Sequence, residues 1–261
     1  MPDSIHSGHR ERIREQYKTH GAEAFLDHQF LELLLTYAIP RKDTNELAHL
    51  LLERFGCLEG VVTAEVAQLQ LVEGVGESTA VFLRMQGDLF RRLRMHRLMD
   101  SRGTIRLGSP VEAAKYAVSQ LSLNTYETVL AVCLNAKKIV QSCERVGGGS
   151  LSEAQIYPRN IAETALLRRA HGILLIHNHP SGDPTPSPAD AETTASVRAA
   201  LESIGVQLFD HIIVGGEHAY SFSTGAVIGV SGTDAEVYSL SEFQQHQAAQ
   251  SGAMLRVMEP Y

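Results

Sequence analysis

The stretch from residue 173 to residue 214 constrains the fold more than any other part of the chain. A short apolar run at 173–176 leads into a turn rich in Pro and Gly, and a helical pattern then covers 187–204 until Gly205 stops it. A second apolar run follows at 206–214. A strand, a helix and a second strand in succession predict a layered α/β domain.

The segments before this stretch continue the same alternation. Residues 128–134 and 139–146 have the composition of strands and are joined by a polar turn, while residues 160–170 have a helical pattern. We therefore expect one α/β domain over residues 104–230.

The two ends of the chain differ from this central part. Residues 9–97 show helical patterns without a strand pattern, which predicts an all-α domain over residues 1–100. The tail over residues 231–261 has weak periodicity, and both a loose helix and disorder remain open for it.

The turn between the two predicted strands carries a candidate metal site. His177 and His179 follow the apolar run directly, and residues i and i+2 of an extended chain point to the same face. Their imidazoles can therefore converge on one ion, and Asp190, at the start of the next helix, can be a third ligand. Two His and one carboxylate suit Zn²⁺ and leave a position open for water, as in a zinc hydrolase.

A structural alternative exists for the second half of this motif. Ser187-Pro-Ala-Asp190 is also a helix-capping sequence, with Ser187 as the N-cap and Pro188 at the first helical position. Capping alone accounts for Ser187 and Asp190, whereas the paired histidines favour a metal site.

A hydrolytic zinc also needs a general base near its water. Glu127, just before the strand at 128–134, is the best candidate, and its alternative interpretation is an exposed residue at a strand start. Asp210 and His211 are further candidates, favoured as supporting groups. Ser187 could donate a hydrogen bond to a developing oxyanion.

Composition and spacing exclude several other classes. The net charge of −7 argues against a strongly basic nucleic-acid-binding protein. The three Cys are widely spaced, which indicates neither a disulfide framework nor a thiolate zinc site. We expect a cytoplasmic protein without a membrane segment, because no signal-peptide core or spanning apolar run occurs. A contiguous His-Asn-His is no evidence for HNH nucleases, and too little chain follows His179 to complete a TIM barrel.

These residues resemble the JAMM (MPN-type) metalloprotease signature, in which a Glu precedes His-x-His, seven residues, Ser, two residues and Asp. Glu127, His177, His179, Ser187 and Asp190 match each element. The closer resemblance is to the bacterial RadC family, carried by His177-Asn-His-Pro-Ser-Gly-Asp-Pro-Thr-Pro-Ser187 and by Asp210-His-Ile-Ile-Val-Gly215.

The resemblance implies a three-layer α/β/α domain around one Zn²⁺ held by His177, His179 and Asp190. It implies that Glu127 activates the water and moves its proton, and that Ser187 steadies the tetrahedral intermediate. The activity that it implies is cleavage of peptide or isopeptide bonds in an unknown protein or peptide substrate.

In the N-terminal domain, Val72-Glu-Gly74-Val75-Gly76 between two helices resembles a helix-hairpin-helix module. Such hairpins bind DNA phosphates through backbone N–H groups, which makes Gly74 and Gly76 candidate contacts. Glu73 and Glu77 oppose this, and residues 1–100 hold 12 Lys and Arg against 15 Asp and Glu. Any DNA binding is therefore expected to be weak, non-specific and salt-sensitive. A plain helix–helix turn is the alternative.

The last predicted helix of this half carries a basic cluster, formed by Arg91, Arg92, Arg94 and Arg97. We favour a solvated helix face as the interpretation of this cluster over a surface that binds phosphates.

Two functions follow from the sequence as a whole. The first is a zinc-dependent hydrolase of JAMM type. The alternative is a non-catalytic DNA- or protein-binding protein that acts in DNA repair or replication.

Overall fold

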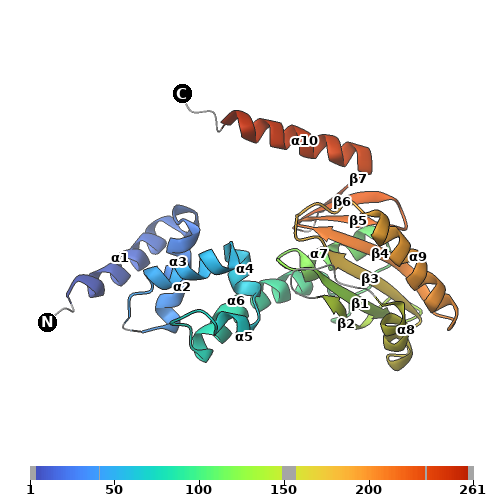
Figure 1. Ribbon diagram of the computed structural model, residues 1–261, viewed down its shortest axis with the longest axis horizontal. Helices are drawn as coiled ribbons and strands as arrows, with labels where there is room; N and C mark the ends of the chain where they lie inside the picture. Colours follow the sequence, from blue (N-terminus) through green and yellow to red (C-terminus); the bar gives the residue numbers. More distant parts are fainter. Residues whose placement is uncertain (1–3, 41, 149–156, 233, 258–261) are drawn as a thin grey trace. The chain divides into compact units, whose positions relative to one another are not determined.

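The structure is a computed structural model that describes residues 4–40, 42–148, 157–232 and 234–257, with the backbone alone for 4–7 and 250–257. The chain divides into two compact units, residues 1–92 and 93–261 (Figure 1). Each unit has its own hydrophobic core. Among the described residues, no helix has the length and apolar character needed to cross a membrane.

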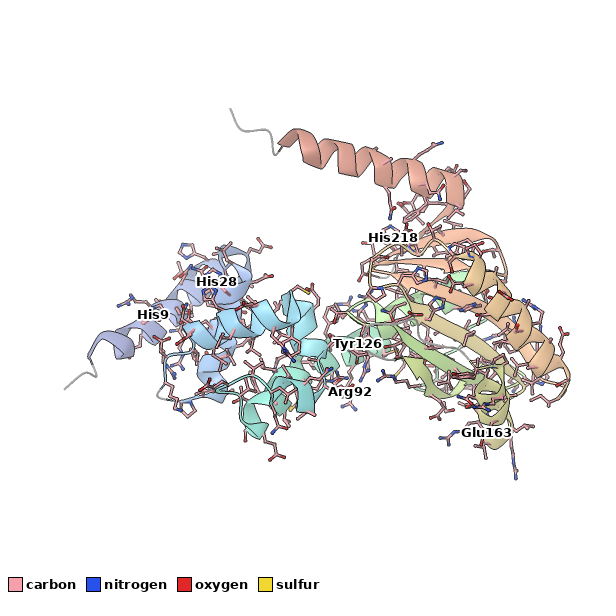
Figure 2. All side chains as sticks on the ribbon, in the orientation of Figure 1. His9, His28, Arg92, Tyr126, Glu163 and His218 are labelled. Atoms are coloured by element: carbon pink, nitrogen blue, oxygen red, sulfur yellow. The ribbon has the colours of Figure 1, made fainter. Side chains whose placement is uncertain are left out.

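The first unit is helical, as predicted. Its elements are α1 (Ser4–His20), a 3₁₀ turn (Ala22–Ala24), α2 (Asp27–Ala38), α3 (Asn45–Phe55), α4 (Leu58–Thr63), α5 (Val66–Leu69) and the start of α6 (Glu77–His96). One buried carboxylate ties three segments together. Glu32 of α2 bonds to Nε2 of His9 in α1 at 2.8 Å and to the side-chain amide of Asn45 in α3 at 2.9 Å. Figure 2 labels His9.

The second unit is built on a mixed sheet. Within the described residues seven strands lie in the order β2-β1-β3-β4-β5-β6-β7. Their bounds are β1 (Thr128–Leu134), β2 (Val140–Gly148), β3 (Gly172–Asn178), β4 (Gln207–Gly215), β5 (His218–Ser221), β6 (Ala226–Ser231) and β7 (Asp234–Ser239). β3 and β4 pair in parallel, and the other neighbouring strands pair antiparallel.

Helices cover both faces of this sheet (Figure 1). Alternate residues of β1 separate the two faces: Leu130, Val132 and Leu134 pack with α7 (Pro110–Leu121). Val129, Ala131 and Cys133 pack with α8 (Pro158–Leu167) and α9 (Pro188–Glu202) on the other face. Because strand side chains alternate, one strand supplies both cores. The α/β fold, with helices preceding it in the chain, is confirmed.

The structure contains elements that the sequence patterns did not predict. α7 was not expected, although Ser109 caps it and Pro110 occupies its first turn. Strands β5, β6 and β7 were also not expected. β7 pairs with β6 along its whole length, and α10 (Leu240–Val257) follows it, so the described part of the tail is a strand and a helix. Positions 233 and 258–261 of that tail lie outside the described residues.

Candidate metal centre

The strand β3 presents the two histidines. His177 is fully buried near its end, and its pairing with Val129 places it on the sheet face that α9 covers. Beyond β3 the N–H of His179 donates to the carbonyl of Val214 at 2.8 Å, so the chain stays extended beside β4. That extension directs His179 to the same face as His177, as the i, i+2 spacing predicts.

Ligand-type atoms of three residues converge at this point. Nε2 of His177 lies 3.1 Å from Nε2 of His179 and 3.2 Å from Oδ1 of Asp190. Nε2 of His179 lies 3.5 Å from Oδ2 of Asp190, and the three residues together form a group able to hold a metal ion. Ligands that bind one tetrahedral zinc at roughly 2.0–2.1 Å lie about 3.3 Å from one another. The separations of His177 Nε2 from His179 Nε2 and from Asp190 Oδ1 are close to this value, so the three side chains are placed to bind one ion.

The protonation of His179 also fits a metal. Its Nδ1 lies 2.9 Å from the carbonyl oxygen of Asp183, which can only accept, so Nδ1 carries the proton and a neutral ring has its lone pair on Nε2. Nδ1 of His177 lies 2.8 Å from Nε2 of His211. The cluster thus directs two imidazole nitrogens and a carboxylate oxygen at one point, a donor set that Zn²⁺ prefers.

The two carboxylate oxygens of Asp190 have different nearest partners. Oδ2 accepts from the N–H of Ser187 at 2.8 Å and from its hydroxyl at 2.6 Å, while Oγ of Ser187 accepts from the N–H of Asp190 at 3.2 Å. The capping box is therefore real, and Oδ1 is the oxygen nearer His177. Capping and metal binding are compatible rather than competing interpretations of this motif. In this arrangement the single hydroxyl proton of Ser187 goes to Asp190, and donation to an oxyanion requires the hydroxyl to rotate.

The electrostatics favour an ionised carboxylate. Burial acts to raise the pKa of Asp190, but the contacts with His177, His179 and Ser187 outweigh it and hold that pKa well below its usual range. Asp190 in turn raises the pKa of the His179 imidazole against the opposing effect of burial. A metal ion must therefore compete with a proton at His179. Burial lowers the pKa of His211 well below its ordinary value.

Glu127 lies in the loop that leads into β1, directly after Tyr126, which Figure 2 labels. The antiparallel pairing of β1 with β3 places Val129 opposite His177, so continuing this register brings Glu127 level with His179. The Glu127 carboxylate is half-buried, and it is among the charges that raise the pKa of His179. The predicted base is therefore on the same side of the unit as the cluster.

Three residues support the cluster, of which His211 was predicted as a supporting group and Asn178 and Gly215 were not predicted. Asn178 bonds the Glu127 loop to β3, His211 contacts His177, and Gly215 lets the loop beyond His179 approach β4. The signal for Gly215 is its position four residues after His211 at the end of a strand, where a backbone approaches closely.

The predicted DNA contacts lie in the first unit. Gly74 has φ +91°, a backbone conformation that L residues rarely adopt, and it forms the turn before α6. Glu73 and Glu77 are exposed on either side of that turn. DNA contact through Gly74 and Gly76 stays a prediction. In the basic cluster, Arg91 pairs with Asp88 on the same helix.

Comparison with known proteins shows which family this chain is similar to. The model of the RadC-like JAB domain matches residues 107–227. UPF0758 protein SPO0054 of Ruegeria pomeroyi is 37% identical over 222 residues, which are 85% of this chain and 97% of that protein. UPF0758 protein FN0909 of Fusobacterium nucleatum is 34% identical over 227 residues, again 85% and 97% of the two chains. A UPF0758 protein of Desulforudis audaxviator is 36% identical over 204 residues, 78% of this chain and 87% of its own.

Proposed function

The chain belongs to the RadC-like family of JAB-domain proteins, and on that premise we propose that it is a zinc-dependent hydrolase that cleaves peptide or isopeptide bonds. The observation that carries the proposal is the convergence of His177, His179 and Asp190, in which Nε2 of His177 lies 3.1 Å from Nε2 of His179 and 3.2 Å from Oδ1 of Asp190, close to the separations of ligands around a tetrahedral ion. Family membership and donor chemistry support the same ligand set.

The residues of the chain have separate tasks in this proposal. His177 and His179 bind through Nε2 and Asp190 through Oδ1. A zinc ion held by these residues would polarise a carbonyl and lower the pKa of a water at the open position towards neutrality. The Glu127 carboxylate takes a proton from the attacking water and passes it to the leaving amine. Ser187 holds Asp190 in place, and on rotation its hydroxyl can donate to the oxygen that gains charge.

The ligand assignment is tested by measuring zinc. We expect the purified full chain to bind close to one zinc per molecule by elemental analysis, and we expect His177→Ala and Asp190→Ala to lose it. The matched control is His171→Ala, because His171 is an exposed imidazole close to β3 but outside the cluster. Wild-type protein that binds no zinc under metal-replete conditions would reject the metal site and leave the binding-protein alternative.

The activity is tested with internally quenched peptides and with Lys-linked isopeptides, because the substrate is not identified. We expect zinc-loaded protein to cleave members of one of these sets and Glu127→Gln to retain zinc while losing cleavage. If Glu127→Gln instead loses zinc, Glu127 is a ligand and not the base. If zinc-loaded wild type and Glu127→Gln are equally inactive on all probes, the hydrolase proposal fails even though the metal site stands.

A further inference from the structure

His211 lies beside the proposed ligand His177 on the neighbouring parallel strand. Its ring is fully buried, and its Nε2 lies 2.8 Å from Nδ1 of His177. On its other side, Nδ1 of His211 lies 2.6 Å from Oγ1 of Thr194, one helical turn beyond Asp190 in α9. The register explains the contact, because His211 pairs with Leu175, and Leu175 shares the α9 face of the sheet with His177.

Hydrogen bonds link the backbone of Asp190 to the ring of His177 through Thr194 and His211, and we call this series the path. The donor and acceptor of each bond can be assigned by starting at Asp190. The carbonyl oxygen of Asp190 can only accept, so Thr194 donates its single hydroxyl proton to it, at 2.6 Å. Oγ1 of Thr194 then accepts from Nδ1–H of His211. A fully buried His211 is neutral, so its Nε2 has a lone pair that accepts from Nδ1–H of His177. His177 therefore has its own lone pair on Nε2, the atom that faces the cluster.

We propose that Thr194 and His211 are positioning residues that hold His177 in the one tautomer able to bind a metal through Nε2. The path also joins two ligands, because it starts at the backbone of Asp190 and ends at the ring of His177. It thereby couples the orientation of the imidazole to the position of the carboxylate. This inference rests on the proposed metal site and adds the two residues that set its geometry.

The surroundings of His211 keep its ring in one orientation. The ring stacks on Phe222, with centroids 5.0 Å apart and planes 7° from parallel. The preceding residue, Asp210, is buried and accepts from the hydroxyl of Ser221 at 2.6 Å and from both the N–H and the hydroxyl of Ser223 at 2.8 Å each. Asp210 thus joins β4 to Ser221 at the end of β5 and to Ser223 in the turn that follows, and Phe222 lies between these two serines in the chain.

The first test uses Thr194, whose replacement by Val keeps the side-chain shape and removes the hydroxyl. We expect Thr194→Val to weaken zinc binding about tenfold, the lower end of the effect of such outer partners. Thr194→Ser restores the hydroxyl and should restore the affinity. Thr164→Val is the matched control, because Thr164 makes the same bond to a carbonyl four residues back, to Asn160 at 2.7 Å in α8, but touches no ligand. Its zinc affinity should stay within about twofold of wild type.

The second test uses His211 directly. His211→Phe keeps a flat ring for Phe222 but offers no acceptor to His177, and we expect a loss of zinc affinity of about 10- to 100-fold. His211→Gln can place an amide oxygen near the former Nε2, so its affinity should lie between that of wild type and that of His211→Phe. Affinity is measured by competition with a chromophoric chelator on the full chain. Cobalt substitution provides a spectral check that the site stays tetrahedral.

The tautomer is measured separately from the metal. In zinc-free protein, ¹⁵N shifts of the His177 ring should show Nδ1 protonated and Nε2 bare, and Thr194→Val should produce a mixture of the two tautomers. The signals are assigned by their loss in His177→Asn. If wild type and Thr194→Val have the same tautomer and the same zinc affinity, the inference is overturned while the metal site stands. If wild type binds no zinc, the proposed function fails, and the tautomer measurement still decides the roles of Thr194 and His211.

Discussion

Asn178 accepts the backbone N–H of Thr128 through its side-chain oxygen at 2.9 Å, although 50 positions separate the two residues. The amide of Asn178 donates in turn to the carbonyls of Asn124 and Tyr126, at 3.0 and 3.1 Å. The middle residue of His-Asn-His, which points to the face opposite the histidines, therefore fixes the loop that carries Glu127. A general base needs this kind of support, because small displacements reduce the rate of proton transfer.

Replacing Asn178 should separate catalysis from metal binding. Asn178→Asp keeps the acceptor for Thr128 but loses the donors to Asn124 and Tyr126, and it places a carboxylate against their carbonyls. We expect a cost of about 1–3 kcal/mol in the free energy of unfolding. We also expect loss of hydrolysis with nearly unchanged zinc stoichiometry, since the loop with Glu127 moves and the ligands do not.

Asn135→Asp is the control for this variant. The side chain of Asn135 accepts from the N–H groups of Lys137 and Ile139 in the β1–β2 turn, so an aspartate can make the same two bonds. Urea unfolding and peptide cleavage should show a near-neutral effect there. Equal losses in the two variants would mean that a buried or half-buried Asp is harmful in general and that Asn178 has no particular role.

A methyl group at Gly215 should disturb the metal site through the loop beyond His179. A Cβ at this position would lie 2.6 Å from the carbonyl oxygen of Gly182 and from the backbone N of Pro184. The displaced loop includes Asp183, whose carbonyl accepts from Nδ1 of His179. We expect Gly215→Ala to lower zinc affinity about 10- to 100-fold, the effect of losing an outer partner of a ligand.

Gly229→Ala provides the comparison for Gly215→Ala. Gly229 also lies in a strand of the sheet, but a Cβ there would meet the ring of His218 at 3.3 Å, and a side chain can shift more easily than a backbone. Chelator competition should give a wild-type zinc affinity for this variant. A wild-type affinity in Gly215→Ala as well would show that the loop adapts without moving His179.

Two helices begin with the same capping box, so the effect of a serine on helix stability can be measured separately from its effect on metal binding. Ser109 and Glu112 form at α7 the same reciprocal bonds that Ser187 and Asp190 form at α9. Removing either serine hydroxyl by substitution with Ala should cost about 1 kcal/mol of stability in urea unfolding. Only Ser187→Ala should also weaken zinc binding, because Asp190 then loses the partner of Oδ2. Equal zinc affinities in Ser109→Ala and Ser187→Ala would mean that Ser187 acts only as a helix cap.

The stability of the second unit should depend on pH through His218 of β5, which Figure 2 labels. The His218 ring packs against Phe243 of α10, with centroids 5.0 Å apart, and burial lowers its pKa more than Glu217 raises it. The unfolded chain binds the proton at the ordinary pKa of about 6.5, and the folded chain binds it only at lower pH. Stability therefore falls as the pH drops from neutrality through 6.5 towards the folded pKa.

His218→Gln removes this titration. Urea unfolding at pH 7.5 and pH 5.5 should therefore show that wild type loses more stability between the two pH values than the variant does. The same loss in both proteins would mean that the proton on His218 is tolerated in the folded state.

The site could be predicted where it is local in sequence. His177, His179 and Asp190 lie at one strand end, in one turn and at one helix start. The alternation of side chains along a strand and a capping sequence were therefore sufficient to predict that these three residues lie close together. In the structure their ligand-type atoms lie within 4.8 Å of one another. The supporting residues depend on strand register instead. Nothing local in the sequence indicates that His211 lies beside His177 or that Gly215 meets Gly182.

The unpredicted elements have physical reasons of their own. α7 is buried along most of its length, with Ala113, Ala114 and Ala117 all inside, so it lacks the polar face that makes a helical period visible. Its capping sequence at Ser109 was the available signal. β7 has the opposite property, because most of its side chains are exposed or half-exposed and its pairing with β6 is made by the backbone.

The ligand set described above has a consequence for net charge. Two neutral imidazoles and the single carboxylate of Asp190 cancel only half the charge of a divalent ion, so an occupied centre keeps one formal positive charge. That charge lies in a chain whose overall formal charge is −7. An occupied centre should therefore attract anionic oxygens in spite of the negative charge of the chain, and small carboxylates are expected to compete with the water for the open position.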